Sequence, residues 1–178
     1  MDGFVLITGI SAAGKSTVAQ LLAESLPRAV HVRGDIFRRF VVSGRAEMSP
    51  DASEEALAQL WLRYRLSAHA GDEYVAAGFT AVVQDIVLGE YLPRYLGLVR
   101  SRPLRLVVLD PSPGVVAARE AGRAKTAYDN GWTVESLHAL NQRETPRLGL
   151  WLDTGALTPA ETVEAILARA DEALIAGA

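Results

Sequence analysis

The sequence has no cysteine, which excludes disulfide bonds and every metal site built on thiolates. It also has no apolar run close to the roughly 20 residues that a membrane-spanning helix needs, so no membrane segment is expected. The first residues include no basic cluster, and the apolar run at 4–10 is too short for a signal peptide. These absences suit a protein of the reducing cytoplasm, which is the expected location.

Lysine is nearly absent, since Lys15 and Lys125 stand beside sixteen arginines. The net charge of −3 gives no general case for binding nucleic acid, so such a partner is possible but not favoured. The arginines are unevenly placed, because five of them face a single acid, Asp35, between positions 28 and 45. This cluster indicates an anionic partner of some kind near Asp35.

The pattern of apolar segments predicts an α/β fold in a single domain, 1–178, without repeats or linkers. Short apolar runs predict strands at 4–8, 29–32, 80–83, 104–109 and 148–152. Between them, capping residues and helical periodicity predict helices at 15–25, from 49–50 toward 78, at 91–99, at 113–123, after Thr133 and from 159 to about 175. This alternation is typical of a parallel sheet.

One segment matches a phosphate-binding motif at every fixed position. The run 9–16, GISAAGKS, fits G-x-x-x-x-G-K-[ST] and lies between a predicted strand and a predicted helix. Its glycines allow backbone N–H groups to turn inward on phosphate oxygens, and the helix adds its positive end. The predicted nucleotide-binding residues are Gly9, Ser11, Ala12, Ala13, Gly14, Lys15, Ser16 and Thr17.

The expected ligands of this P-loop are ATP and Mg²⁺. Lys15 would reach the β- and γ-phosphates, and the hydroxyl of Ser16 would bind Mg²⁺. The motif does not separate a kinase from an ATPase or a GTPase. The sequence has no N/TKxD-type guanine motif, which favours ATP.

Asp35 is the leading candidate for chemistry on the acceptor side. It follows the second predicted strand, at the carboxyl edge of a parallel sheet, where ligands bind. There it could orient or deprotonate an attacking hydroxyl. Asp is equally a favoured helix N-cap, and 36–40 suits a short helix, so its position leaves both interpretations open.

Two further carboxylates follow predicted strands. Asp85 could hold Mg²⁺ through water or contact the acceptor, and its alternative is a polar strand end. Asp110 fits the same pattern, but the prolines at 111 and 113 indicate a turn, so we rank it lower.

Two arginines four residues apart predict a cationic helix face. Arg119 and Arg123 would lie on one side of a helix, beside a polar segment without periodicity. Together they predict a lid at about 119–132 that clamps the transferring phosphates. The alternative is an ordinary solvated face.

Taken together, these segments resemble the small P-loop kinases of the nucleoside monophosphate kinase-like group, and most of all chloramphenicol phosphotransferase-like proteins. The resemblance rests on GISAAGKS, GDIF, VVQDIVLGEYL and REAGR, in that order along the chain. It implies a three-layer α/β/α fold of the P-loop NTPases, with a five-stranded parallel sheet in the order 2-3-1-4-5. It also implies Asp35 as catalytic base, Asp85 near metal or acceptor, Arg119 and Arg123 in a lid, and the loop 154–157 near the adenine.

A second resemblance concerns the acceptor. The run 35–38, DIFR, is similar to the D-x-x-R element of polynucleotide 5′-kinases, in which the arginine contacts a substrate phosphate; here that residue is Arg38. The leading hypothesis is phosphoryl transfer from ATP to a hydroxyl of a small molecule, antibiotic-like or a metabolite. The alternatives are a polynucleotide or nucleotide kinase and a regulatory module that only binds nucleotide. The oligomeric state is left open.

Overall fold

A computed structural model describes residues 1–122, 128 and 131–176. These residues form a five-stranded sheet with the order β2-β3-β1-β4-β5, in which every neighbouring pair is parallel. The strands are β1 (Phe4–Thr8), β2 (Ala29–Arg33), β3 (Thr80–Gln84), β4 (Leu104–Leu109) and β5 (Leu150–Leu152). The predicted parallel sheet and its order are confirmed.

The central strand β1 is buried along its whole length. Its side chains alternate between two cores, as the period of two in a strand requires. Val5 and Ile7 pack into the core on one face, and Phe4 and Leu6 pack into the core on the other. The strand therefore has no polar face, as expected for a parallel sheet that is covered on both sides.

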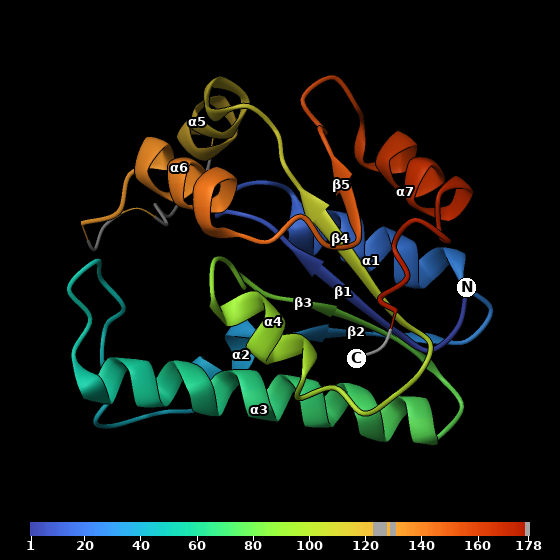
Figure 1. Cartoon of the computed structure of the whole chain (residues 1–178), viewed down its shortest axis with the longest axis horizontal. Coiled ribbons are helices and arrows are strands. Elements are labelled where there is room, and N and C mark those ends of the chain that lie inside the picture. Colours follow the sequence, from blue (N-terminus) through green and yellow to red (C-terminus); the bar gives the residue numbers. More distant parts are fainter. Residues whose placement is uncertain (123–127, 129–130, 177–178) are drawn as a thin grey trace.

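Helices cover both faces of the sheet, which makes three layers (Figure 1). The helices are α1 (Lys15–Ser25), α2 (Asp35–Arg39), α3 (Glu54–Ala76), α4 (Tyr91–Leu96), α5 (Pro113–Ala121), α6 (Val134–Glu144) and α7 (Pro159–Ala168). Helices α3 and α4 contribute to the core with Phe4, whereas α1, α5, α6 and α7 contribute to the core with Val5.

The long helix α3 begins later than its sequence indicates. The predicted start at the Ser-Pro pair 49–50 is wrong, because the N-cap is Ser53. Its side chain accepts a hydrogen bond from the backbone N–H of Ala56, at 3.2 Å. Two serines in one stretch can each cap a helix, and the choice between them is made by packing.

The last helix ends earlier than predicted, at Ala168 instead of about residue 175. The following residues return to the sheet, where the N–H of Leu106 donates to the carbonyl of Ala173 and the N–H of Ile175 donates to that of Leu104. Strand β5 is only three residues long and pairs with the second half of β4 alone. The tail therefore satisfies backbone groups of β4 that β5 does not reach.

Within the residues that the structure describes, no helix is both long enough and apolar enough to cross a membrane. The cytoplasmic location stays a prediction.

The close packing of α3 against β1 depends on Gly71, and this dependence can be tested. A β-carbon at Gly71 would lie 2.3 Å from Cε2 of Phe4, a buried ring. We expect Gly71→Ala to lower the free energy of unfolding, since overpacking costs about 1–3 kcal/mol and the helix preference for alanine returns about 1 kcal/mol. Urea unfolding would measure the change.

Gly114→Ala is the matched control, because Gly114 is also helical and its β-carbon would meet no atom within 4 Å. It should leave stability unchanged or raise it slightly. Equal effects of the two substitutions would contradict the close packing of Gly71 on Phe4.

Candidate active site

The loop between β1 and α1 has the backbone that its motif predicts. Gly9 and Gly14 have positive φ values of 137° and 100°, and Ala12 has a φ of 60°, which is rare for a residue with a side chain. A β-carbon at Gly9 would also lie 2.4 Å from the carbonyl oxygen of Leu109, so the end of β4 approaches too closely for any side chain. The loop requires glycine there for both conformation and space.

Lys15 is the first residue of α1 and is buried. Its Nζ donates a hydrogen bond to the carbonyl oxygen of Ile10, at 2.7 Å, so the side chain folds back over its own loop. Ser16 and Thr17 follow and are exposed. The loop and these side chains line one wall of a cavity of about 440 Å³.

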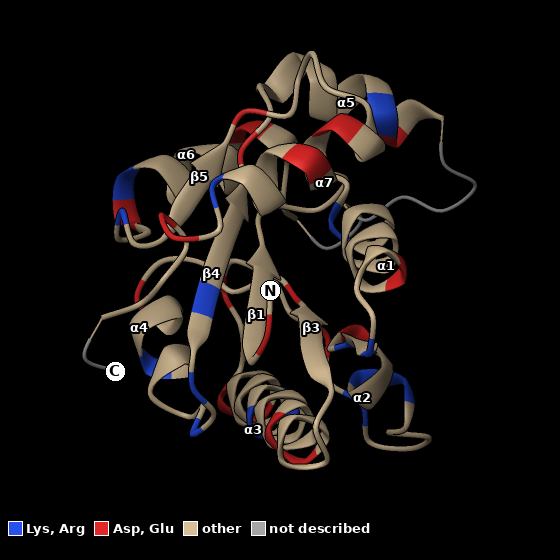
Figure 2. Ribbon diagram, turned by 90° about the vertical axis from the view of Figure 1, so that its right-hand side faces the viewer, with Lys and Arg blue, Asp and Glu red and all other residues tan. Residues whose placement is uncertain are grey.

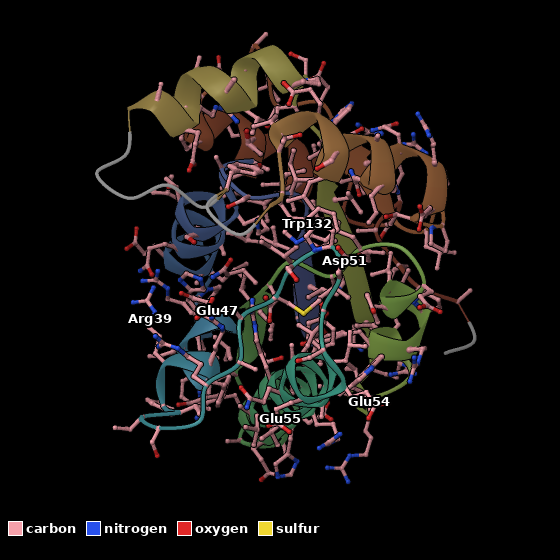
Figure 3. All side chains as sticks on the ribbon, turned by 90° about the vertical axis from the view of Figure 1, so that its left-hand side faces the viewer. Arg39, Glu47, Asp51, Glu54, Glu55 and Trp132 are labelled. Atoms are coloured by element: carbon pink, nitrogen blue, oxygen red, sulfur yellow. The ribbon has the colours of Figure 1, made fainter. Side chains whose placement is uncertain are left out.

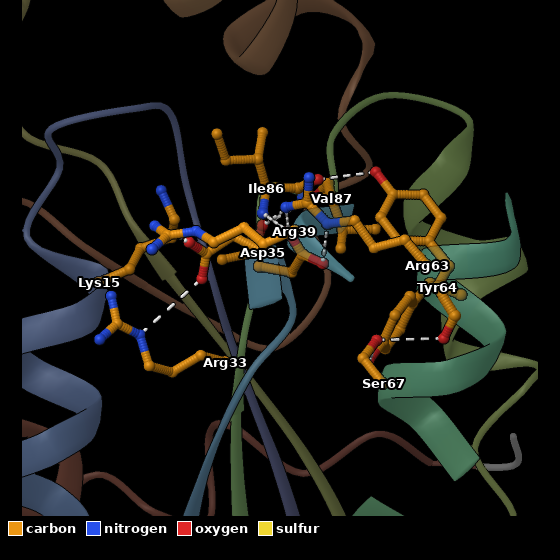
Figure 4. A network of polar contacts seen from close by, with 12 residues as sticks. Lys15, Arg33, Asp35, Arg39, Arg63, Tyr64, Ser67, Ile86 and Val87 are labelled. Carbon is orange, nitrogen blue, oxygen red and sulfur yellow. Dashed lines mark hydrogen bonds and ion pairs between the residues drawn. The ribbon is translucent and has the colours of Figure 1, made fainter. Parts of the chain in front are cut away.

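Asp35 lines the same cavity from the end of β2, which β3 separates from β1 in the sheet. It is the first residue of α2, and Gly34 occupies the N-cap position without a side-chain cap. The carboxylate instead contacts two arginines: Oδ2 accepts a hydrogen bond from Nη2 of Arg39 at 2.7 Å, and Oδ1 lies 3.8 Å from Nε of Arg33 (Figure 4). Oδ1 is buried and accepts no hydrogen bond from any residue that the structure describes. The contacts therefore contradict the N-cap interpretation and leave one carboxylate oxygen without a hydrogen bond.

Asp85 also lines this cavity, and its carboxylate is held by an arginine that sequence reasoning missed. Nε of Arg63 donates to Oδ2 at 2.8 Å, Nη2 of Arg63 donates to Oδ1, and the N–H of Ile86 donates to Oδ1 at 2.7 Å (Figure 4). The Asp85 side chain is fully buried and that of Arg63 is 15% exposed. Burial lowers the pKa of Arg63 from its usual value.

The position of Arg63 on α3 carried a signal in the sequence. It lies three residues after Leu60 and four before Ser67, on the stripe that faces the sheet. An arginine on such a stripe needs a buried partner, because an unpaired charge there is strongly unfavourable. That partner is Asp85, which only the fold identifies.

The contact between the second and third strands leaves no room for a side chain at Gly34. A β-carbon there would lie 2.0 Å from Oδ2 of Asp85. The φ of Gly34 is −60°, so the reason for glycine is space and not backbone conformation. This glycine allows Asp35 and the pair of Asp85 with Arg63 to share one cavity.

Arg119 reaches the cavity from the opposite side, on α5. Nη1 donates to the carbonyl oxygen of Ala13 at 3.2 Å, and Nη2 donates to that of Thr154 at 2.8 Å. The guanidinium thus bridges the P-loop and the start of the loop 154–157, of which Thr154 and Leu157 line the cavity. Arg123 and half of the predicted lid, 119–132, lie outside the described residues.

Two of the predicted residues lie away from this cavity. Asp110 accepts hydrogen bonds from the side-chain amides of Asn141 and Gln142, so it ties β4 to α6. Arg38 forms an ion pair with Glu47 and lines a second cavity of about 60 Å³, which Arg63 also lines. Arg38 is thus beside the main cavity and not in its wall.

The segment between α2 and α3 extends toward the beginning of α6 (Figure 3). A β-carbon at Gly131 would lie 3.4 Å from Cδ of Pro50, and Figure 3 shows Trp132 near Asp51. Residues far apart in the chain therefore meet where this segment approaches α6.

Comparison with known proteins assigns the chain. The model of the AAA_33 family, an AAA domain, matches residues 4–146. The chain belongs to this family. No curated protein matches it.

Solved structures of small P-loop kinases share the fold. A sugar kinase from Janibacter sp. HTCC2649 is 20% identical with a TM-score of 0.70, over 97% of this chain and 96% of that one. A gluconokinase from Sinorhizobium meliloti 1021 is 23% identical with a TM-score of 0.63, over 96% and 93%. The tunicamycin resistance protein of Deinococcus radiodurans is 16% identical with a TM-score of 0.64, over 98% of both chains. The expected likeness to small P-loop kinases is confirmed, and this fold implies nucleotide use.

The side chains of the AAA_33 domain fit Mg²⁺ delivered with a nucleotide. Among the described residues, no three His, Cys, Asp or Glu side chains gather into a metal cluster. Mg²⁺ needs no such cluster, since it often keeps several waters and takes phosphate oxygens with one or two protein ligands. The exposed hydroxyl of Ser16 suits this ion. The contacts of Asp85 with three N–H groups favour a role in holding Arg63, and its role at Mg²⁺ stays a prediction.

The packing of Gly34 against Asp85 predicts a coupled effect on stability. We expect Gly34→Ala to lower the free energy of unfolding by about 1–3 kcal/mol, because the new methyl group overlaps the carboxylate. In an Asp85→Ala background, the same substitution should cost much less, since the overlapping atoms are gone. Urea unfolding of the four proteins would measure the coupling.

Gly97→Ala serves as the control, because its β-carbon would meet only atoms at 3.5 Å or more. If Gly34→Ala were equally costly with and without the Asp85 carboxylate, the close contact would be refuted.

Proposed function

We propose that this protein transfers the γ-phosphoryl group of ATP to a hydroxyl group of a small molecule. The observation that carries the proposal is that Lys15 of the P-loop and the carboxylate of Asp35 line the same cavity. A nucleotide-binding loop alone supports ATP hydrolysis or regulation equally well. A carboxylate that lines the same cavity from the end of β2 adds what a hydroxyl acceptor requires.

The nucleotide is held by groups on both sides of the cavity. The P-loop amides and Lys15 bind the phosphates, and Ser16 holds the Mg²⁺ that offsets the charge of the β- and γ-phosphate oxygens. Arg119 adds a positive charge beside the loop, because it rests on the carbonyl of Ala13. The loop 154–157 borders the adenine.

Asp35 acts on the acceptor. Its carboxylate accepts the proton of the acceptor hydroxyl while the hydroxyl oxygen forms a bond to the γ-phosphorus, and the bond from the γ-phosphorus to the β–γ bridging oxygen breaks to release ADP. The hydrogen bond from Arg39 to Oδ2 keeps the carboxylate oriented. Most of the rate enhancement comes from position and charge, so few side chains take part in bond changes.

The similarity to solved kinases supports the reaction type. Structures with this fold include a sugar kinase, a gluconokinase and a shikimate kinase, and sugars, gluconate and shikimate are hydroxylated small molecules. A structure of an RNA repair complex also matches over 78% of this chain, with a TM-score of 0.57. A polynucleotide or nucleotide kinase is therefore the second candidate, favoured by the arginines at α2.

Loss of Lys15 tests the nucleotide site. We expect Lys15→Ala to lower turnover by about 10²–10³-fold or more, because a charge that stabilises the transferring phosphates is lost. ADP release in the presence of Mg²⁺, ATP and acceptor would measure it. Arg169→Ala, which removes an exposed positive charge on the far end of α7, should leave turnover unchanged. Unchanged activity of Lys15→Ala would refute the P-loop assignment.

Loss of the Asp35 charge separates catalysis from binding. We expect Asp35→Asn to reduce kcat by about 10²–10⁴-fold, as removal of a general base does, while the affinity for ATP stays within about threefold. Kcat and a separate ATP titration would be compared with those of Asp171→Asn, an exposed carboxylate far along the chain. Equal losses in turnover and ATP affinity would indicate a structural role for Asp35.

The acceptor class can be identified by measuring ADP release in the presence of hydroxylated antibiotics, nucleosides, sugars or 5′-hydroxyl oligonucleotides. Each compound is tested with the natural protein and with Asp35→Asn. Stimulation by oligonucleotides that falls steeply with salt would favour the polynucleotide kinase, because phosphate contacts release counterions. Tight ATP binding without stimulation by any class would favour the regulatory module and contradict the kinase.

A further inference from the structure

Arg63 belongs to two cavities at once. Its side chain lines the main cavity with Lys15 and Asp35, and it lines the smaller cavity between α2 and α3 with Arg38. Among the described residues, it is the basic residue that lines both the cavity proposed for phosphoryl transfer and the smaller cavity between α2 and α3. An acceptor whose hydroxyl lies at Asp35 would therefore extend along Arg63.

The guanidinium of Arg63 retains hydrogen-bonding capacity. It has five N–H groups, and two of them are used by Asp85. The other three donate to no acceptor among the residues that the structure describes, although only 15% of the side chain is exposed. Because Arg63 lines the main cavity, a ligand there that supplies an acceptor can form charge-assisted hydrogen bonds with these N–H groups.

Asp85 makes this guanidinium rigid. The carboxylate holds Nε and Nη2 together, is fully buried, and is itself fixed by the N–H of Ile86. The planar fork is thereby oriented before any ligand arrives, which reduces the entropy lost on binding. Carboxylate and phosphate groups match this geometry.

The charges around Arg63 favour an anion. The ion pairs at the acceptor side join five arginines to three carboxylates: Arg33 and Arg39 with Asp35, Arg38 and Arg45 with Glu47, and Arg63 with Asp85. Figure 2 shows basic segments gathered at α2. The positive charge of Arg38 contributes to the lowered pKa of Arg63, after the larger effect of burial, so the two guanidinium groups are electrostatic neighbours.

We propose that Arg63 determines acceptor specificity by binding an anionic group, a carboxylate or a phosphate, that the acceptor carries in addition to its reacting hydroxyl. This inference rests on the proposed kinase function. It assigns Asp85 as the positioning residue that holds Arg63, and it narrows the acceptor from any hydroxylated small molecule to a hydroxylated anion.

The test uses acceptors in matched pairs that differ in the anionic group. Gluconate and sorbitol form the carboxylate pair, and a nucleoside 3′-phosphate with its nucleoside forms the phosphate pair. The natural protein should prefer the anionic member of one pair, which also identifies the source of the anion. Arg63→Gln should raise KM for that member by about 10-fold or more, as loss of a charge-assisted hydrogen bond does, and should change KM for the neutral member less than about threefold.

Arg65→Gln is the matched control, since Arg65 lies on the same helix and does not line the main cavity. Arg63→Gln leaves Asp85 without its partner and risks unfolding, so Arg63→Gln with Asp85→Asn is the second variant, in which two neutral amides replace the ion pair. A merely structural Arg63 would change KM equally for both members of a pair, and that result overturns the proposal.

A binding measurement separates this proposal from the kinase function. With the P-loop filled by Mg²⁺ and ADP, the anionic member of one pair should raise Tm, the neutral member should not, and Arg63→Gln with Asp85→Asn should remove the difference. If no acceptor releases ADP but this shift is present, the kinase function fails while the anion site stands. If neither pair shows a preference that depends on Arg63, in turnover or in Tm, the anion site is refuted.

Discussion

The parallel pairing of β1 with β3, and of β3 with β2, is the constraint on which the site depends. The register places Ile7 beside Gln84, and Gln84 beside Arg33, so the three strands end together at one edge of the sheet. The residues that follow these ends are the P-loop, the Gly34-Asp35 pair and Asp85. Side chains separated by 20 to 70 positions in the chain thereby line one cavity, as ligand sites in open parallel sheets do.

The ion pair between Asp85 and Arg63 is the second constraint. Two desolvated charges contribute little net stability, but removal of one partner is strongly destabilising because it leaves the other charge buried and unpaired. The pair therefore ties α3 to the end of β3 in one geometry. It also explains Gly34, which has no room for a side chain, and the orientation of Asp85, whose carboxylate points at α3 and receives three N–H groups. The acceptor side of the site is consequently built around a fixed guanidinium.

The fold and the nucleotide loop were predictable because local patterns carry them. The alternation of apolar strands with capped helices indicates a parallel sheet, and the motif at 9–16 indicates the phosphate loop. The errors lie where local signals compete. Ser49 and Ser53 are both acceptable caps by sequence, and in the structure Ser53 is the N-cap of α3. Asp110, which the sequence ranks below Asp85, accepts hydrogen bonds from Asn141 and Gln142, partners that no local pattern identifies.

The interpretation of Asp35 shows the same limit. An aspartate at the start of a short helix is ambiguous by sequence, because capping and catalysis both place it there. The structure has Gly34 at the cap position and Arg39 bonded to the Asp35 carboxylate. Its other oxygen is left without a hydrogen bond from the described residues, which no local pattern indicates.

The order of residues alone was sufficient for the class of fold, the P-loop and the positions of candidate carboxylates, because each depends on contacts within a strand, a turn or a helix. Tertiary structure decided which of those carboxylates share a cavity, which are occupied by partners, and that Arg63 belongs with them. The reason is physical: the environment of a charged side chain is set by groups that only long-range packing brings within a few ångströms, and its role follows from that environment.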